Sequence, residues 1–302
     1  MYDIIGDIHG HADTLEVLLQ KMGYKRMRGV YRHPQERKVV FVGDFIDRGP
    51  KIRETLHLVR DMCEADQALA VMGNHEYNAI CFHTPHTQQG GFFRSHTVKE
   101  INQHIETLRQ FAHFQSEWDS FLGWFGSLPL YLDMPDFRVV HACWDQKHID
   151  WLTANYTGMT TDFLSMACDR EHPSNVYQIV EETLKGKEYR LPDGRSFTDK
   201  DGTVRQDCRM RWWASSDERT HLGNVLMECP EELKKEAVKN PQDILEYRDE
   251  KPVFFGHYWL KGKPSTTNSN AICLDYSVAK DGILVACRLH KEKGTLSKTF
   301  VY

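Results

Sequence analysis

The sequence lacks the long hydrophobic runs of a membrane-spanning protein. No stretch of its 302 residues approaches the roughly 20 apolar residues that cross a bilayer. The residues after Met1 also lack the basic segment and apolar core of a signal peptide. The eight cysteines are scattered without a Cys-x-x-Cys pair, which argues against a zinc ribbon, a thioredoxin-like site or a disulfide framework. These absences predict a protein of the cytoplasm with reduced cysteines and no membrane partner.

An excess of positive charge is missing too. The formal net charge is −5, so the composition carries no strong signal for nucleic-acid binding through a basic surface. Hydrophobic residues make up 40% and charged residues 27%, a balance typical of soluble globular proteins rather than disordered ones. No internal repeat or low-complexity segment is present, and nothing in the composition specifies an oligomeric state.

Strand and helix patterns alternate in the first half of the chain. We expect strands at 2–5, 30–32, 38–42, 68–72 and 137–140, with a turn at 33–37 between the second and third, and helices near 15–22 and 52–63. Apolar residues at helical spacing indicate a helix or a broken pair over 99–122. Such alternation predicts an α/β fold with a largely parallel, buried sheet flanked by helices.

The stretch 145–250 breaks this rhythm. It holds a helix near 174–185, with Ser174 as N-cap and Gly186 as C-cap, and then turn signals at 192–194 and 200–202. Candidate functional residues lie on both sides of this stretch. We therefore interpret it as an α+β insertion within a single domain, 1–302, which ends with strands at 252–255, 271–275 and 283–289.

Five short motifs carry most of the chemistry, and each directly follows an apolar run. They are Gly6-Asp7-Ile8-His9-Gly10, Gly43-Asp44-Phe45-Ile46-Asp47-Arg48-Gly49, Gly73-Asn74-His75-Glu76, Val140-His141 and Gly256-His257. Ligands of open α/β sheets bind beyond the carboxyl ends of the strands, so these side chains should gather at one sheet edge. Asp, Asn and His donors suit divalent manganese, iron and zinc. One such motif alone is more often a turn or a cap. The five together predict a two-metal site.

These motifs, complete and in this order, resemble the signatures of the calcineurin-like metallophosphoesterase superfamily, in its phosphoprotein-phosphatase branch. The resemblance covers 1–80, 120–145 and 250–290, and it implies a calcineurin-like sandwich of central β-sheets flanked by helices. It further implies an enzyme that hydrolyses phosphate esters or phosphoanhydrides by attack of a metal-bridging hydroxide. The cofactors would be two divalent ions, manganese in the first place, with iron or zinc as alternatives.

The resemblance also assigns roles to individual residues. On one metal it puts Asp7 and His9, on the other Asn74, His141 and His257, and between them Asp44 as the bridge.

Three further residues would assist the reaction. His75 would be the general acid, Asp47 would orient it, and Arg48 would bind the phosphate oxygens. A second phosphate-binding arginine would come from Arg209 or Arg211, for which a solvated charge beside packed tryptophans is an equal alternative.

The substrate is less closely defined. The run 270–275 before 282–284 is similar to bacterial symmetrical dinucleoside polyphosphatases and small bacterial serine/threonine phosphatases, and it departs from them at 276–280. We expect a small phosphate ester or a nucleotide of the diadenosine-polyphosphate kind, with the insertion setting the choice. A protein serine/threonine phosphatase acting on a phosphoprotein is the alternative. A non-catalytic metal-binding regulatory module is the alternative from another class.

Overall fold

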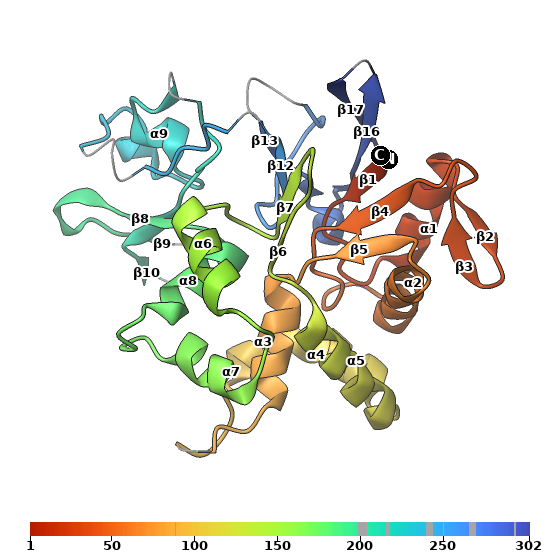
Figure 1. The fold of residues 1–302 in the computed structure, drawn as a ribbon. Coiled ribbons are helices and arrows are strands. Elements are labelled where there is room, and N and C mark those ends of the chain that lie inside the picture. The colour runs from red at the N-terminus through yellow and green to blue at the C-terminus, as the bar shows by residue number, and fades with distance from the viewer. Residues whose placement is uncertain are drawn as a thin grey trace.

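Two β-sheets that pack face to face form the centre of the protein (Figure 1). The computed structural model describes residues 1–87, 89–198, 204–215, 218–239, 244–249, 251–265, 270–292 and 294–302. The first sheet has the order β17-β16-β1-β4-β5 and the second the order β13-β12-β7-β6. Their strands are β1 (Tyr2–Ile5), β4 (Lys38–Phe41), β5 (Ala68–Ala70), β6 (Tyr131–Asp133), β7 (Arg138–Val140), β12 (Val253–Phe255), β13 (Ala271–Cys273), β16 (Ala286–Glu292) and β17 (Thr295–Val301).

The central strands of both sheets are parallel and buried. β4 runs parallel to β1 and β5, and β12 runs parallel to β7 and β13, whereas β6, β16 and β17 pair antiparallel. Ile4 and Val40 of the first sheet and Val139 and Phe254 of the second share the core between the sheets. Their neighbours, such as Ile5, face the opposite core. Burial on both faces explains why these strands are continuous apolar runs in the sequence.

A layer of helices covers the other face of the first sheet (Figure 1). These helices are α1 (Ala12–Lys21), α2 (Ile52–Glu64), α3 (Asn74–His83), α4 (Val98–Phe111) and α5 (Gln115–Ser127). The helical pattern predicted over 99–122 is therefore a broken pair, in which Phe111, Trp118 and Phe121 contribute aromatic rings to the core. Among the described helices, none has both the length and the apolar character of a membrane span.

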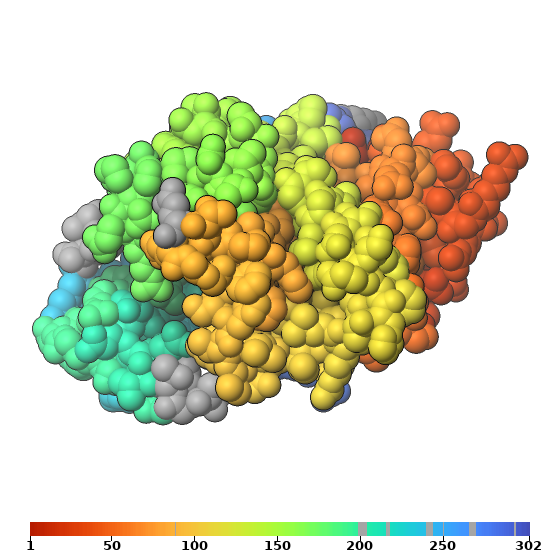
Figure 2. Space-filling model, turned by 90° about the horizontal axis from the view of Figure 1, so that it is seen from below, coloured from red at the N-terminus to blue at the C-terminus, as the bar shows by residue number. Residues whose placement is uncertain are grey.

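The predicted insertion lies against the second sheet and α3. Its elements are α6 (Gln146–Asn155), α7 (Thr161–Cys168), α8 (Val176–Lys185), β8 (Glu188–Arg190), η1 (Pro192–Gly194), β9 (Phe197–Thr198), β10 (Val204–Arg205), β11 (Asp207–Arg209), α9 (Leu222–Val225) and η3 (Glu231–Leu233). Trp212 is fully buried, packs on Phe255 of β12 and donates its indole N–H to Ala142 O at 2.9 Å. Figure 2 shows the segment with α3 between the insertion helices and α4–α5. The insertion thus shares a core with the second sheet.

The two strands on either side of the turn at 33–37 do not pair with each other. β3 (Val30–Arg32) pairs with β2 (Lys25–Met27), and β4 pairs with β1 and β5. The reason is burial, because β4 is apolar on both faces and needs two neighbours, whereas β2 is exposed and can form a surface hairpin.

Two further details differ from the predictions. The N-cap of α8 is Asn175, in the left-handed region at φ 52°, rather than Ser174. The strand predicted at 283–289 is divided, because β15 (Ile283–Leu284) pairs with β14 (Asp275–Tyr276) while β16 joins the first sheet. A short turn, η5 (Val278–Lys280), connects β14 to β15. The turn signal at 200–202 lies outside the described residues.

Candidate metal centre

All six predicted metal ligands lie just beyond the carboxyl ends of the parallel strands. Asp7 and His9 follow β1, Asp44 follows β4, Asn74 opens α3 after β5, His141 follows β7 and His257 follows β12. Each is at most 7% exposed. Since parallel strands of both sheets end at this edge, the fold brings residues together that are up to 250 positions apart.

Asp44 lies between two groups of nitrogen donors. Its Oδ2 is 3.5 Å from His9 Nε2, and its Oδ1 is 3.4 Å from His141 Nε2. Asp44 is also the member shared by two clusters whose donor atoms lie within 4.8 Å of one another, one with His9 and His75 and the other with His141 and His257. A carboxylate with one oxygen toward each group has the placement that bridging two cations requires.

The remaining donors converge on the same space. Asn74 Oδ1 is 3.0 Å from His141 Nε2 and 2.8 Å from His257 Nδ1. Asp7 Oδ2 accepts a hydrogen bond from the backbone N–H of His257 at 2.9 Å. Within the described residues, Asp7 Oδ1, His9 Nε2 and His257 Nε2 are buried without a hydrogen-bond partner. Buried polar atoms normally have partners, so this donor set fits divalent cations.

Backbone carbonyls set the orientation of two histidine rings. His9 Nδ1 lies 3.0 Å from Ile46 O, and His141 Nδ1 lies 2.8 Å from Val42 O. A carbonyl can only accept, so each Nδ1 donates and each Nε2 is the ring nitrogen directed to the centre. Metal-binding histidines are commonly held in this way.

The electrostatics of the centre favour a cation. Burial raises the pKa of the Asp7 carboxyl well above its usual value, and the charge of Asp275 raises it further. Burial alone would lower the pKa of His141, but the nearby Asp44 carboxylate outweighs it and raises that pKa to about 10. A divalent ion would stabilise both carboxylates and would compete with the proton on His141.

The backbone around the ligands leaves no room for side chains at two glycines. A Cβ on Gly256 would lie 1.8 Å from Asp7 Oδ1, and one on Gly73 would lie 2.3 Å from Asp44 Oδ1. His9, Asp44 and His257 themselves have φ of 46°, 56° and 74°. Left-handed conformations at non-glycine residues cost free energy and persist where the surrounding structure enforces them, often at functional sites.

His75 is held beside the metal ligands without being one of the unpartnered donors. Its Nδ1 lies 2.5 Å from Asp47 Oδ2, and its Nε2 lies 3.5 Å from Arg48 Nη2 and 4.0 Å from Asp44 Oδ2. Burial lowers the pKa of His75, but the Asp44 and Asp47 carboxylates outweigh it, and the net shift is upward. A protonated imidazole with Nε2 toward the centre has the geometry of a proton donor. Because Asp7 Oδ1 lacks a partner, Asp7 suits the ligand role better than His75 does.

Asp47 has further partners in α4 that the sequence analysis did not select. His104 Nδ1 and Thr107 Oγ1 lie 2.7 Å and 2.6 Å from Asp47 Oδ1. Residues three positions apart on a helix lie on the same face, but this spacing does not predict which residues that face contacts.

Glu76 and Asp275 are two more buried carboxylates that support the site. Glu76 accepts hydrogen bonds from the backbone N–H groups of Asp44, Phe45 and Gly73 at 2.8 Å, 2.8 Å and 3.0 Å. Its position three residues after Gly73 is the spacing of a capping box, a signal that could have identified it. Asp275 accepts from the backbone N–H groups of Trp259 and Ser277.

The two candidate arginines differ in position. Arg209 lies on β11 with its Cζ 5.8 Å from the ring centroid of Tyr258, and its charge adds to the effect of burial in lowering the pKa of His257. Arg211 directs its Nε to Met227 Sδ at 3.2 Å. Arg209 is therefore the one whose charge reaches the centre.

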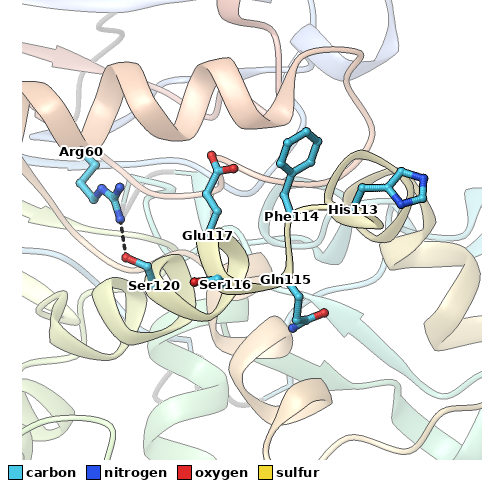
Figure 3. A pocket seen from close by; sticks show the side chains of 7 residues that line it. All are labelled: Arg60, His113, Phe114, Gln115, Ser116, Glu117 and Ser120. Atoms are coloured by element: carbon cyan, nitrogen blue, oxygen red, sulfur yellow. Dashed lines mark hydrogen bonds between the residues drawn. The ribbon is translucent and has the colours of Figure 1, made fainter.

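A shallow depression of about 540 Å³ lies apart from these residues, between α2 and the start of α5 (Figure 3). Arg60 donates to Ser120 across it, and its other lining residues are His113, Phe114, Gln115, Ser116 and Glu117. None of them is a candidate site residue, so the depression has no part in the centre.

Comparison with known proteins identifies the family. The sequence model of the calcineurin-like phosphoesterases matches residues 2–258, and the chain belongs to this family. It is 35% identical over 144 residues to a protein of Halalkalibacterium halodurans named bis(5'-nucleosyl)-tetraphosphatase PrpE (asymmetrical), a match that covers 46% of this chain and 54% of that protein. A Bacillus subtilis protein of the same name is 46% identical over 74 residues, covering 24% and 30%. The chain thus spans about half the length of the curated relatives it matches, or less.

A solved structure confirms the predicted sandwich. A serine/threonine phosphatase of Saccharomyces cerevisiae, described as similar to human phosphatase PP5, aligns with a TM-score of 0.51 at 15% identity and covers 99% of this chain and 78% of that one. At this identity the likeness concerns the fold alone.

Proposed function

We propose that the protein is a dinuclear-metal-dependent phosphohydrolase whose substrates are dinucleoside polyphosphates. The observation that carries the proposal is the position of Asp44, with one oxygen toward each of two groups of buried donors and the His75–Asp47 pair beside it. A metal-binding module without catalysis has no need of a histidine paired with a carboxylate beside its metal ligands.

Each residue has a defined task in this proposal. When bound, two divalent ions, which we propose to be manganese, supply a hydroxide nucleophile near neutral pH and neutralise the phosphate. Asp7 and His9 hold one ion, Asn74, His141 and His257 hold the other, and Asp44 serves both. His75 gives the proton on Nε2 to the leaving oxygen, while Asp47 keeps Nδ1 protonated. Arg48 binds the non-bridging oxygens through its planar guanidinium.

The names of the relatives support a nucleotide substrate and an asymmetrical cut, whereas the resemblance in the sequence is to symmetrical enzymes. We propose the asymmetrical cut. Diadenosine tetraphosphate incubated with the manganese-loaded protein should then yield ATP and AMP, which chromatography separates from the two ADP of a symmetrical cut. ADP as the product would overturn the asymmetrical assignment alone.

A wider panel tests the substrate class. Failure to hydrolyse diadenosine tetraphosphate, with rapid turnover of phosphoserine peptides, would replace the proposal by a protein phosphatase. No turnover of p-nitrophenyl phosphate despite two bound metals would leave a regulatory module. A location in the cytoplasm remains part of the proposal, and fractionation of the native cells tests it.

A further inference from the structure

A tryptophan with two cationic neighbours lies beside the candidate metal centre. The ring centroid of Trp259 is 6.3 Å from that of His9. Arg48 Cζ lies 4.2 Å from the centroid of the Trp259 ring, and Lys280 Nζ lies 3.3 Å from it. The indole therefore connects the predicted phosphate-binding arginine to a second cation, which falls in the segment 276–280 where the sequence departs from its family.

One buried carboxylate accepts hydrogen bonds from the backbone of Trp259 and from the start of the turn that carries Lys280. Asp275 is 3% exposed, and its Oδ2 accepts from the N–H of Trp259 at 2.7 Å while its Oδ1 accepts from the N–H of Ser277 at 2.9 Å. Ser277 opens the turn η5, which ends at Lys280. Trp259 and Ser277 have φ of 54° and 62°, so the surroundings must hold these strained conformations in place. Asp275 thus links the backbone of Trp259 to the turn that ends at Lys280.

The arrangement places two positive charges beside the candidate metal centre. Arg48 and Lys280 are both exposed, and they are no further apart than their two distances to the ring centroid together. In the described part of the chain, the polar contact of Arg48 is with His75 Nε2 at 3.5 Å rather than with a carboxylate. Two cations over one ring beside the candidate metal centre attract anions to this part of the surface.

We propose that Trp259 and Lys280 form a subsite for a second phosphate group next to the one that Arg48 binds. The subsite would make the protein bind polyphosphate chains better than single phosphates, and it rests on the proposed function because Arg48 holds the reacting group. The indole face contacts the lysine ammonium, a compact charge with three rotatable N–H donors, which is a group that binds phosphate oxygens. Adjacent phosphate groups share one bridging oxygen and therefore lie close together. A second cation over the same ring would contact the phosphate group next to the reacting one.

Two non-hydrolysable probes test the subsite by calorimetry on the manganese-loaded protein. Methylenediphosphonate offers two phosphate-like groups, and methylphosphonate offers one. For Lys280→Gln we expect the ratio of the two affinities to fall roughly fivefold to tenfold, because the second group loses a charge-assisted hydrogen bond. Lys280→Arg should keep a ratio near that of the wild type. Lys25→Gln, which changes an exposed lysine on β2, is the matched control and should leave the ratio unchanged.

The subsite is overturned by an unchanged affinity ratio in Lys280→Gln, whether both probes weaken equally or neither weakens. An unchanged ratio together with loss of adenosine binding in Trp259→Leu would make the indole a platform for the base. The measurement needs no turnover. A wild-type protein that prefers the diphosphonate but leaves diadenosine tetraphosphate intact would therefore refute the proposed function and retain the subsite.

Discussion

His104 donates from Nδ1 to Asp47 Oδ1 at 2.7 Å, while the other oxygen of the same carboxylate faces His75 Nδ1. Thr107 donates to the same Oδ1, and it accepts from the backbone N–H of Asp47 at 3.1 Å. Burial would raise the pKa of Asp47, but the hydrogen bonds from His104 and His75 outweigh it and hold that pKa well below its usual value. Helix α4 thus keeps charged the carboxylate that orients the proposed general acid.

Substitution of His104 should therefore act through the general acid. For His104→Ala we expect kcat on phenyl phosphate to fall roughly tenfold and kcat on p-nitrophenyl phosphate to fall less, because a poor leaving group depends more on the donated proton. His104→Asn, which keeps a donor near the Nδ1 position, should recover most of the rate. Equal losses on both substrates, or loss of bound metal, would show a purely structural role.

Substitution of the proposed general acid, His75, should have a larger effect on kcat. His75→Asn should keep both metals and lose roughly a hundredfold or more of kcat on phenyl phosphate, since the leaving oxygen then departs without a proton. Metal content by mass spectrometry and turnover are measured on the same sample. Loss of metal from this variant would mean that His75 is a ligand.

Asp44→Asn should remove both metals. The variant keeps the shape of the side chain, and asparagine tolerates the left-handed φ of 56° at this position, so a change in metal content reflects the lost charge. Asp13→Asn, at an exposed carboxylate on α1, is the control and should bind metal normally. A full pair of ions in Asp44→Asn would contradict the bridging role.

Substitutions of the two arginines in the insertion, Arg209 and Arg211, should differ in their effect on KM. We expect Arg209→Ala to raise KM for diadenosine tetraphosphate roughly tenfold, because its charge reaches the centre, and Arg211→Ala to change KM little. Steady-state measurements on both variants decide between them. A larger effect at Arg211 would reverse the assignment.

A buried ion-pair group ties the first strand to the last part of the chain. Asp3 is 0% exposed and accepts hydrogen bonds from Arg37, Arg288 and the hydroxyl of Tyr24. Burial would raise the pKa of Asp3, but the hydrogen bonds from Arg37 and Arg288 outweigh it, so the pKa lies below the usual 3.8. Removing this carboxylate leaves Arg37 buried and unpaired. For Asp3→Asn we expect a loss of about 3–5 kcal/mol in the free energy of unfolding, measured in urea.

The same group predicts a pH dependence. Its contribution is complete above the unfolded pKa near 3.8 and is lost as pH falls through the lower folded value, because the unfolded chain then binds more protons. Wild-type stability should fall in this acid range, and Asp3→Asn should lack that part of the fall. Asp66→Asn, at a carboxylate that is 80% exposed, should lose stability in the acid range as the wild type does.

Sequence patterns predicted the parts of the fold that local chemistry controls. Val39, Val40 and Phe41 read as a strand buried on both faces, and that is their environment in β4. Strand pairing could not be predicted from the sequence where it depends on partners far along the chain. The strand at 283–289 looked continuous, yet β15 and β16 pair with different neighbours, because burial and hydrogen bonding with distant segments decide where a strand bends.

The candidate site likewise has features that the sequence predicts and features that only the structure shows. Motifs at strand ends were enough to select Asp7, His9, Asp44, Asn74, His141 and His257, since donor type and position after a strand are local properties. Only the folded chain shows that Asp44 directs one oxygen to each donor group and that His104 supports Asp47. Lys280 reaches the ring of Trp259 for the same reason, because contacts between segments depend on how sheets, helices and turns pack.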